Sequence, residues 1–201
     1  MLPKRHWTPR YVANRLALML DAKIKPRNPW LTADSVRLLS QLIKPTDVGV
    51  EFGSGRSTVW FAARLAHLTS VEDNSKWFDL VTRQIESCGL GGRISYKLRS
   101  TPDDYVGEAL CLPDESIDFC LIDGIERDRC AEAMLPKMRS GGLFVVDNVN
   151  WFIPNLHTKS PASLRKSHYT EGWQRIAGQL SSWRRVWTSN GVTDTAIWFK
   201  P

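Results

Sequence analysis

The sequence predicts an α/β fold in which helices alternate with the strands of a mostly parallel sheet. Three observations carry this prediction. Short apolar segments alternate with amphipathic ones between residues 48 and 146, the turn Gly53-Ser54-Gly55 follows the first apolar segment, and an Asn-Gly pair separates the last two extended segments. Such alternation is typical of parallel strands joined by right-handed crossovers, whereas an Asn-Gly pair is typical of a tight antiparallel hairpin.

Two helices are expected before the first strand, within an N-terminal helical cap formed by residues 1–46. Thr8 followed by Pro9 predicts the start of the first helix, over residues 10–23, because a threonine hydroxyl caps free N–H groups and proline suits the first helical position. A second helix, over residues 32–43, starts at a threonine for the same reason. We expect both helices to pack over the edge of the sheet where a ligand would bind.

Seven strands are expected in the rest of the chain, with helices between them. The strands are expected at residues 48–52, 68–71, 94–98, 117–122, 143–146, 183–188 and 195–199. Helices are expected from residue 57 and at 77–87 and 127–138, a helix or loop at 104–109, and a turn at 140–142. The last two strands form an antiparallel hairpin around Asn190-Gly191. All 201 residues are expected to form one domain, because this length suits a single core.

The glycine turn and Glu72 have the spacing of a nucleotide-binding βαβ unit. Gly53 and Gly55 permit positive φ and let the backbone approach a ligand closely. The helix expected from Ser57 would point its free N–H groups at that ligand. Glu72, at the end of the second strand, would accept hydrogen bonds from the two ribose hydroxyls. The alternative is a strand–helix turn that binds no ligand.

Glu51, two residues before the first glycine, indicates which nucleotide derivative binds. A carboxylate there would repel a pyrophosphate but attract an ammonium or sulfonium group. An acidic residue followed by Gly-x-Gly resembles motif I of the class I S-adenosylmethionine (SAM) methyltransferases, although Ser57 replaces the third glycine common in that family. The resemblance implies a Rossmann-like fold and SAM as cofactor. It implies cofactor contacts with Glu51, Gly53, Ser54, Gly55, Ser57, Glu72, Asp73, Ser100 and Asp123.

Three side chains with oxygen ligands follow the fourth and fifth expected strands: Asp123, Asp147 and Asn148. Two carboxylates and an amide suit Mg²⁺ or a similar hard cation, which could bind a substrate hydroxyl and lower its pKa. The pattern resembles the divalent-metal-dependent O-methyltransferases of small bacterial type. The resemblance implies a metal at these three residues and a hydroxyl oxygen as methyl acceptor. The alternatives are a strand-end turn at Asp123 and an Asx-type cap at Asp147 and Asn148.

The residue that removes the acceptor proton stays open at this stage. Catechol-type enzymes carry a lysine three residues after the first aspartate, where this chain has Glu126. Glu126, His157 and His168 are therefore candidates for the base, and Asp123 is expected to be catalytic beside the methyl group. Both histidines lie in residues 149–172, a long polar connection that we expect to act as a substrate lid.

Composition limits the choice of partners. The formal net charge is +6 and the pI is about 9.3, which suits an acidic partner such as nucleic acid, although the basic residues are scattered. No apolar run is long enough to span a bilayer. Four cysteines without a CxxC pair favour a reduced, cytoplasmic protein. Tryptophans in irregular segments are expected at the rim of the site: Trp7, Trp30, Trp151 and Trp173.

These observations together predict a SAM-dependent O-methyltransferase. We expect it to methylate a hydroxyl of a small molecule or carbohydrate with the assistance of Mg²⁺, and it could form a homodimer. Two alternatives stay open. One is a metal-independent RNA methyltransferase, which the positive charge suggests. The other is a non-catalytic, nucleotide-binding protein with a Rossmann-like fold.

Overall fold

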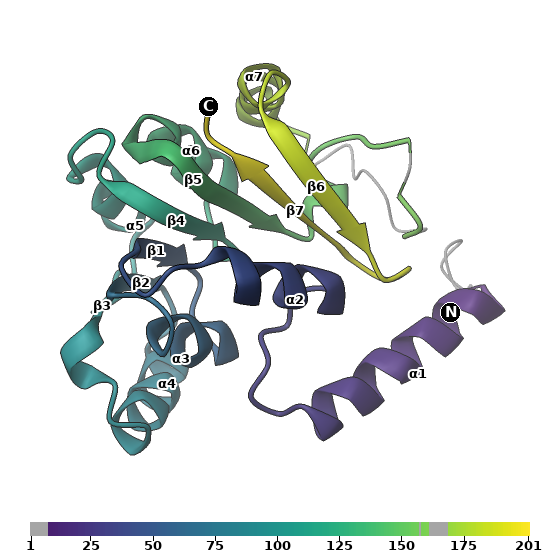
Figure 1. The fold of residues 1–201 in the computed structure, drawn as a ribbon, viewed down its shortest axis with the longest axis horizontal. Helices are drawn as coiled ribbons and strands as arrows, with labels where there is room; N and C mark the ends of the chain where they lie inside the picture. The colour runs from purple at the N-terminus through teal and green to yellow at the C-terminus, as the bar shows by residue number, and fades with distance from the viewer. Residues whose placement is uncertain (1–7, 157, 161–168) are drawn as a thin grey trace.

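The structure is a computed structural model that describes residues 8–156, 158–160 and 169–201 (Figure 1). The strands are β1 (Val48–Phe52), β2 (His67–Glu72), β3 (Ile94–Leu98), β4 (Ile117–Ile122), β5 (Met138–Asp147), β6 (Arg184–Ser189) and β7 (Asp194–Phe199). The α-helices are α1 (Pro9–Ile24), α2 (Ala33–Leu42), α3 (Arg56–Ala62), α4 (Ser75–Ser87), α5 (Pro102–Leu110), α6 (Arg127–Met134) and α7 (Glu171–Leu180). Short 3₁₀ turns are η1 (Gly91–Arg93), η2 (Leu135–Lys137) and η3 (Val149–Trp151).

The seven strands form one sheet in the order β3-β2-β1-β4-β5-β7-β6. The first five strands are parallel, and β7 runs antiparallel to both β5 and β6. The predicted fold class is therefore confirmed, including the C-terminal hairpin. Phe52, at the end of β1, pairs with Val71 of β2 and with Ile122 of β4. The carboxyl ends of these three strands consequently meet at one edge of the sheet.

Helices cover both faces of the sheet, and the strand side chains alternate between the two layers. Phe119 and Leu121 of β4 pack in a cluster with α2 and α3, whereas Cys120 and Ile122 pack in a cluster with α5, α6 and α7. The strands at the centre are buried on both sides. This arrangement explains why they appear in the sequence as continuous apolar runs.

The N-terminal helices occupy two different places. Thr8 and Thr32 cap α1 and α2, as predicted. α2 does not lie over the ligand edge, because its apolar side packs against α3 and the sheet face. Only α1 lies at that edge, beside the β6–β7 turn (Figure 1). Gly191 in this turn has φ +81°, and a Cβ there would lie 2.1 Å from Nδ2 of Asn14, so glycine permits the approach of α1.

Two segments differ from the prediction near the C-terminal half of the sheet. The helix expected at 127–138 ends at Met134, because Pro136 follows and the chain continues as η2. The turn expected at 140–142 is instead an irregular part of β5, with Gly141 at φ +79°. The strand therefore starts five residues earlier than the prediction, at Met138 rather than at 143.

The segment predicted as a lid is partly built into the core. Val149, Phe152 and Ile153 are buried among residues of α6 and α7. α7 itself was not predicted, and Trp173, which was expected at the rim of the site, is 1% exposed. Residues 158–160 are held to the hairpin, since Ser160 Oγ donates to Asp194 Oδ1 at 2.6 Å. Residues 149–153 thus pack against α6 and α7, and Ser160 is bonded to the hairpin.

Two further expectations concern the whole chain. All four cysteines are free thiols, of which Cys120 and Cys130 are buried. In the described ranges, no helix combines the length and apolar character needed to cross a bilayer.

Candidate functional site

The loop after β1 lies at the centre of the ligand edge. Gly53 has φ +94°, and a Cβ on it would lie 2.5 Å from the backbone nitrogen of Gly124. Asp123 N donates to Phe52 O at 2.8 Å, so the ends of β1 and β4 touch through their backbones. Only glycine fits here, both for its φ and for this close approach. A Cβ on Gly55 would lie 3.7 Å from the nearest ring atom of Trp77, which is an ordinary contact.

Glu72 fastens this loop to the end of β2. Its Oε2 accepts hydrogen bonds from Ser54 N at 3.1 Å and Ser54 Oγ at 2.5 Å, and its Oε1 accepts from Asn74 N at 2.9 Å. The Tyr96 hydroxyl lies 2.7 Å from Ser54 Oγ, and Trp77 Nε1 donates to Ser54 O at 2.8 Å. The carboxylate predicted for a ribose is therefore at the expected strand end and preorganised by the glycine loop.

Glu51 lies beneath the loop and is fully buried. Its Oε2 accepts from Thr58 Oγ1 at 2.6 Å and from Ser70 Oγ at 2.7 Å. Its Oε1 is buried with no hydrogen-bond partner among the described residues. Burial raises the pKa of Glu51 to about 7, against the opposing effect of the hydrogen bonds from Thr58 and Ser70 and of the nearby Ser57 hydroxyl. The Glu51 carboxyl thus stabilises the loop from below, and its Oε1 can still accept a hydrogen bond.

The other predicted cofactor residues lie around this loop in different ways. Ser57 is nearly buried and interacts with Glu51 below the loop. Asp73 follows Glu72 and is partly exposed, and burial together with the charge of Glu72 raises its pKa. Ser100 is exposed after β3. The structure therefore places Asp73 and Ser100 at the open edge, while Ser57 and Glu51 support the loop from inside.

The three predicted metal ligands also meet at this edge, but a guanidinium holds two of them. Arg127, at the start of α6, donates through Nη2 to Asp123 Oδ1 at 2.8 Å and through Nη1 to the backbone oxygen of Asp147 at 2.6 Å. Its Nε donates to Gly124 O at 2.9 Å. The Arg127 charge thus lies between the ends of β4 and β5.

Asp147 has both carboxylate oxygens engaged, whereas Asp123 accepts from Arg127 through Oδ1. Asp147 Oδ1 accepts from Thr195 Oγ1 at 2.6 Å and Oδ2 accepts from Asn148 Nδ2 at 3.0 Å. Asn148 Nδ2 also donates to Thr193 Oγ1 at 2.6 Å. Burial raises the pKa of Asp147, and the nearby charge of Asp123 adds to this effect. Burial also raises the pKa of Asp123, although Arg127 opposes the rise.

This donor set does not fit a divalent cation. A hard cation needs carboxylate or amide oxygens that face a common point and are free to coordinate. Here Arg127 and Thr195 use one oxygen of each aspartate, and the nitrogen of the Asn148 amide is the atom that faces its neighbours.

The candidate bases are only partly placed. Glu126 Oε2 accepts from Arg129 Nη1 at 3.2 Å, and the residue adopts φ +46° just before α6. His157 and His168 lie outside the described residues.

Sequence reasoning missed three residues that shape the site: Trp77, Tyr96 and Arg127. The signal for Arg127 was present, because it stands four residues after Asp123 at the start of an expected helix, a spacing at which side chains meet. No comparable signal existed for Trp77 and Tyr96. They reach Ser54 from α4 and β3 only because the sheet brings these elements together.

No protein-family model and no curated protein sequence matches this chain. Solved structures do match it. An O-methyltransferase from Bacillus cereus in complex with SAH has a TM-score of 0.63 at 18% identity, covering 100% of this chain and 93% of that one. A Staphylococcus aureus protein, provisionally named a caffeoyl-CoA O-methyltransferase, has a TM-score of 0.63 at 17% identity, covering 92% and 91%. The chain thus shares the Rossmann-like fold of these two proteins.

The same fold also serves a different acceptor. An rRNA methylase from Streptococcus thermophilus has a TM-score of 0.56 at 9% identity, covering 83% of this chain and 94% of that one. At these identities the likeness concerns the fold alone. The acceptor has to be argued from this chain's own residues.

Proposed function

We propose that this chain is a SAM-dependent methyltransferase that acts on a hydroxyl oxygen of a small molecule. The observation that carries the proposal is the pair of hydrogen bonds from Ser54 of the glycine loop to Glu72. It sets two carboxyl oxygens at the end of β2, the position of a ribose-binding acid, beside a loop where Gly53 leaves no room for a side chain. Glu51 adds a buried oxygen under the same loop that has no hydrogen-bond partner in the part of the chain that the structure describes.

Each of these groups has a role in this proposal. Glu72 holds the ribose, and Glu51 together with the Gly53–Gly55 backbone receives the methionine end of SAM. The partly exposed Asp73 and Ser100 border the adenine. Bound SAM supplies an electrophilic methyl group on a sulfonium. The acceptor oxygen attacks the methyl carbon in line, the carbon–sulfur bond breaks, and its electron pair stays on the sulfur of the departing thioether.

The acceptor hydroxyl must also lose its proton. Of the predicted bases, Glu126 already pairs with Arg129, an interaction that a base role would have to break. His157 and His168 stay predictions for this role. Asp123 keeps a structural partner in Arg127 and borders the methyl side rather than acting as a base.

A metal is not part of the proposed reaction. The Mg²⁺ predicted at Asp123, Asp147 and Asn148 would have to displace the Arg127 guanidinium and the bonds from Thr195. We therefore expect methyl transfer to continue in the presence of EDTA. Activity that disappears with EDTA and returns with Mg²⁺ would contradict this expectation and restore the three residues as ligands.

The proposal is tested by transfer of label from methyl-labelled SAM to catechols, sugars and RNA. The control is Glu72→Gln, which keeps the size of the side chain but weakens the hydrogen bonds to a ribose. We expect label in a hydroxyl compound, and an increase in the Kd of SAM for Glu72→Gln of about tenfold. A chain that does not bind SAM would refute the proposal.

RNA methylation is the second candidate, favoured by the net charge of +6. It predicts label in RNA and a rate that falls steeply as salt rises, because contacts with phosphates release counterions. SAM binding without transfer to any acceptor would instead support the non-catalytic alternative.

A further inference from the structure

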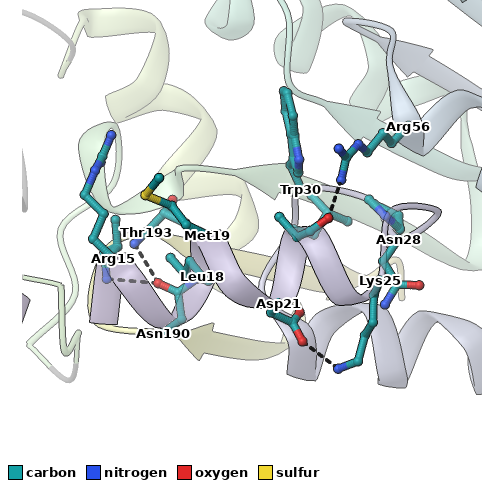
Figure 2. A pocket seen from close by; sticks show the side chains of 14 residues that line it. Arg15, Leu18, Met19, Asp21, Lys25, Asn28, Trp30, Arg56, Asn190 and Thr193 are labelled. Atoms are coloured by element: carbon teal, nitrogen blue, oxygen red, sulfur yellow. Dashed lines mark hydrogen bonds and ion pairs between the residues drawn. The ribbon is translucent and has the colours of Figure 1, made fainter. Parts of the chain in front are cut away.

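A cavity of about 490 Å³ lies at the ligand edge, between α1 and the β6–β7 turn (Figure 2). α1, the segment 25–31, Arg56 and the turn residues Asn190, Val192 and Thr193 form its walls. The volume is in the range of small-molecule sites. Because Gly191 brings the turn against Asn14, the N-terminal and C-terminal parts of the chain build this cavity together.

The cavity adjoins both halves of the proposed reaction site. Arg56 in its wall directly follows Gly55 of the glycine loop, where the cofactor is proposed to bind. Thr193 in the opposite wall accepts a hydrogen bond from Asn148 Nδ2, at the end of β5. If the chain binds SAM as proposed above, a molecule in this cavity lies next to the cofactor loop and the carboxyl end of the sheet.

The charges in the cavity favour an anion. Asp21 is neutralised by Lys25 at 2.7 Å. Arg15 and Arg56 form no ion pair with any described residue, and Figure 2 shows them at opposite ends of the cavity. Arg56 Nη1 donates to Ala22 O at 3.1 Å, which fixes its position and leaves its other N–H groups available.

The remaining surface favours a ring or another apolar body. Leu18 and Met19 of α1 line the cavity. Met19 is 58% exposed and Leu18 is only partly buried, so both present apolar surface that a ligand could cover. Trp30 is 62% exposed, an unusual state for the largest apolar side chain. The Arg56 guanidinium lies 5.2 Å from the centre of the Trp30 ring, so a flat surface and a positive charge adjoin each other (Figure 2).

We propose that this cavity binds the methyl acceptor, and that the acceptor is a hydroxylated, ring-bearing compound with a carboxylate or phosphate group. Guanidinium groups bind both anions through paired hydrogen bonds. The cavity beside Trp151 and Trp173 is a weaker choice. Its arginine, Arg127, already donates to the Asp123 carboxylate and to the backbone oxygens of Asp123, Gly124 and Asp147.

The test measures binding of three probes to the full chain by calorimetry, with and without SAH. The probes are 3,4-dihydroxybenzoate, 2-hydroxyphenyl phosphate and the neutral 3,4-dihydroxybenzamide. The first two separate a carboxylate from a phosphate ligand. We expect at least one anionic probe to bind about tenfold more tightly than the neutral amide.

The variants are Arg15→Gln, Arg56→Gln and the double variant, and the single variants identify which end holds the anion. Arg83→Gln is the control, because it removes the same charge from an exposed position on α4. The double variant is expected to lose the preference for the anion, while Arg83→Gln keeps it. Circular dichroism confirms that each variant is folded.

Three outcomes would overturn the proposal: equal or undetectable binding of all probes, a preference that survives in the double variant, or a loss of SAM affinity in Arg56→Gln without any loss of anion binding. The last would assign this arginine to the carboxylate of SAM. SAM binding is titrated separately in the wild type. A failure there refutes the proposed methyl transfer, whereas the anion preference of the SAH-free chain still decides the nature of the cavity.

Discussion

Nη2 of Arg127 lies 2.8 Å from Oδ1 of Asp123, and water reaches little of this pair because the two side chains are 15% and 30% exposed. The same guanidinium donates to the backbone of Asp147. The Arg127 guanidinium, which is always charged, thus connects the ends of β4 and β5 through hydrogen bonds. It neutralises Asp123 next to Asp147, whose carboxyl is buried.

Arg127→Gln should destabilise the fold by about 2 kcal/mol, because it leaves Asp123 without its counter-charge and several backbone oxygens without a donor. The free energy of unfolding in urea measures this. Arg129→Gln is the matched control, since Arg129 lies on the same helix but pairs with exposed Asp103. An equal loss of stability in both variants would show that Arg127 has no special role.

Glu51 should make stability depend on pH. Its pKa in the folded chain is about 7, against an ordinary value of 4.5, so the folded chain binds this proton more tightly than the unfolded chain. Stability therefore falls as the pH rises from 4.5 to 7, by about 3 kcal/mol for this group alone.

Glu51→Gln removes this contribution and keeps every other titrating group. As the pH rises from 4.5 to 7, the wild type loses this stability and the variant does not. The free energy of unfolding of the variant should therefore increase relative to that of the wild type. Urea titrations across this range measure it. Parallel stability curves for the two proteins would contradict the raised pKa.

Gly53→Ala should cost about 3 kcal/mol of stability and abolish SAM binding, because it adds a Cβ at positive φ and against Gly124 N. Gly89→Ala separates the two causes. Gly89 also has positive φ, but a Cβ there meets nothing within 4 Å, so only about 1 kcal/mol should be lost. Thermal unfolding and SAM titration are the measurements. Equal effects in both variants would rule out the close contact as the cause.

Trp77→Phe should raise the Kd of SAM about fivefold, since it removes the hydrogen bond that holds Ser54 O and so loosens the cofactor loop. Trp187→Phe is the control. It removes an indole hydrogen bond of the same length, to Asp194, outside the loop. Calorimetry with SAM compares the two. An unchanged Kd in Trp77→Phe would show that the loop does not need this bond.

Local chemistry explains which elements could be predicted. α1 and α2 begin where their threonine caps stand, and the hairpin turns at its Asn-Gly pair. α7 was missed although Trp173, Ile176 and Leu180 have helical spacing and are all buried. The polar residues 149–172 predict one continuous lid, which extends past the point where α7 begins.

The candidate site could be predicted only in part. The strand ends brought Gly53, Glu72 and Asp123 together, as expected from parallel topology. The sequence could not show that Glu51 lies under the loop, because β1 is buried on both faces and either side of it can carry a polar group. Nor could it show that Arg127 lies between the aspartates, since tertiary packing sets the direction of a long side chain.

The contact between Asn14 and Gly191 has a consequence for how the chain folds. These residues lie near opposite ends of the sequence, so the cavity that they enclose closes only after the final hairpin has been synthesised. Closing so large a loop costs entropy, and α1 buries only Tyr11 in return. Detachment of α1 should therefore be the least costly opening of the chain, and it should be visible as rapid hydrogen exchange in α1 while the central strands remain protected.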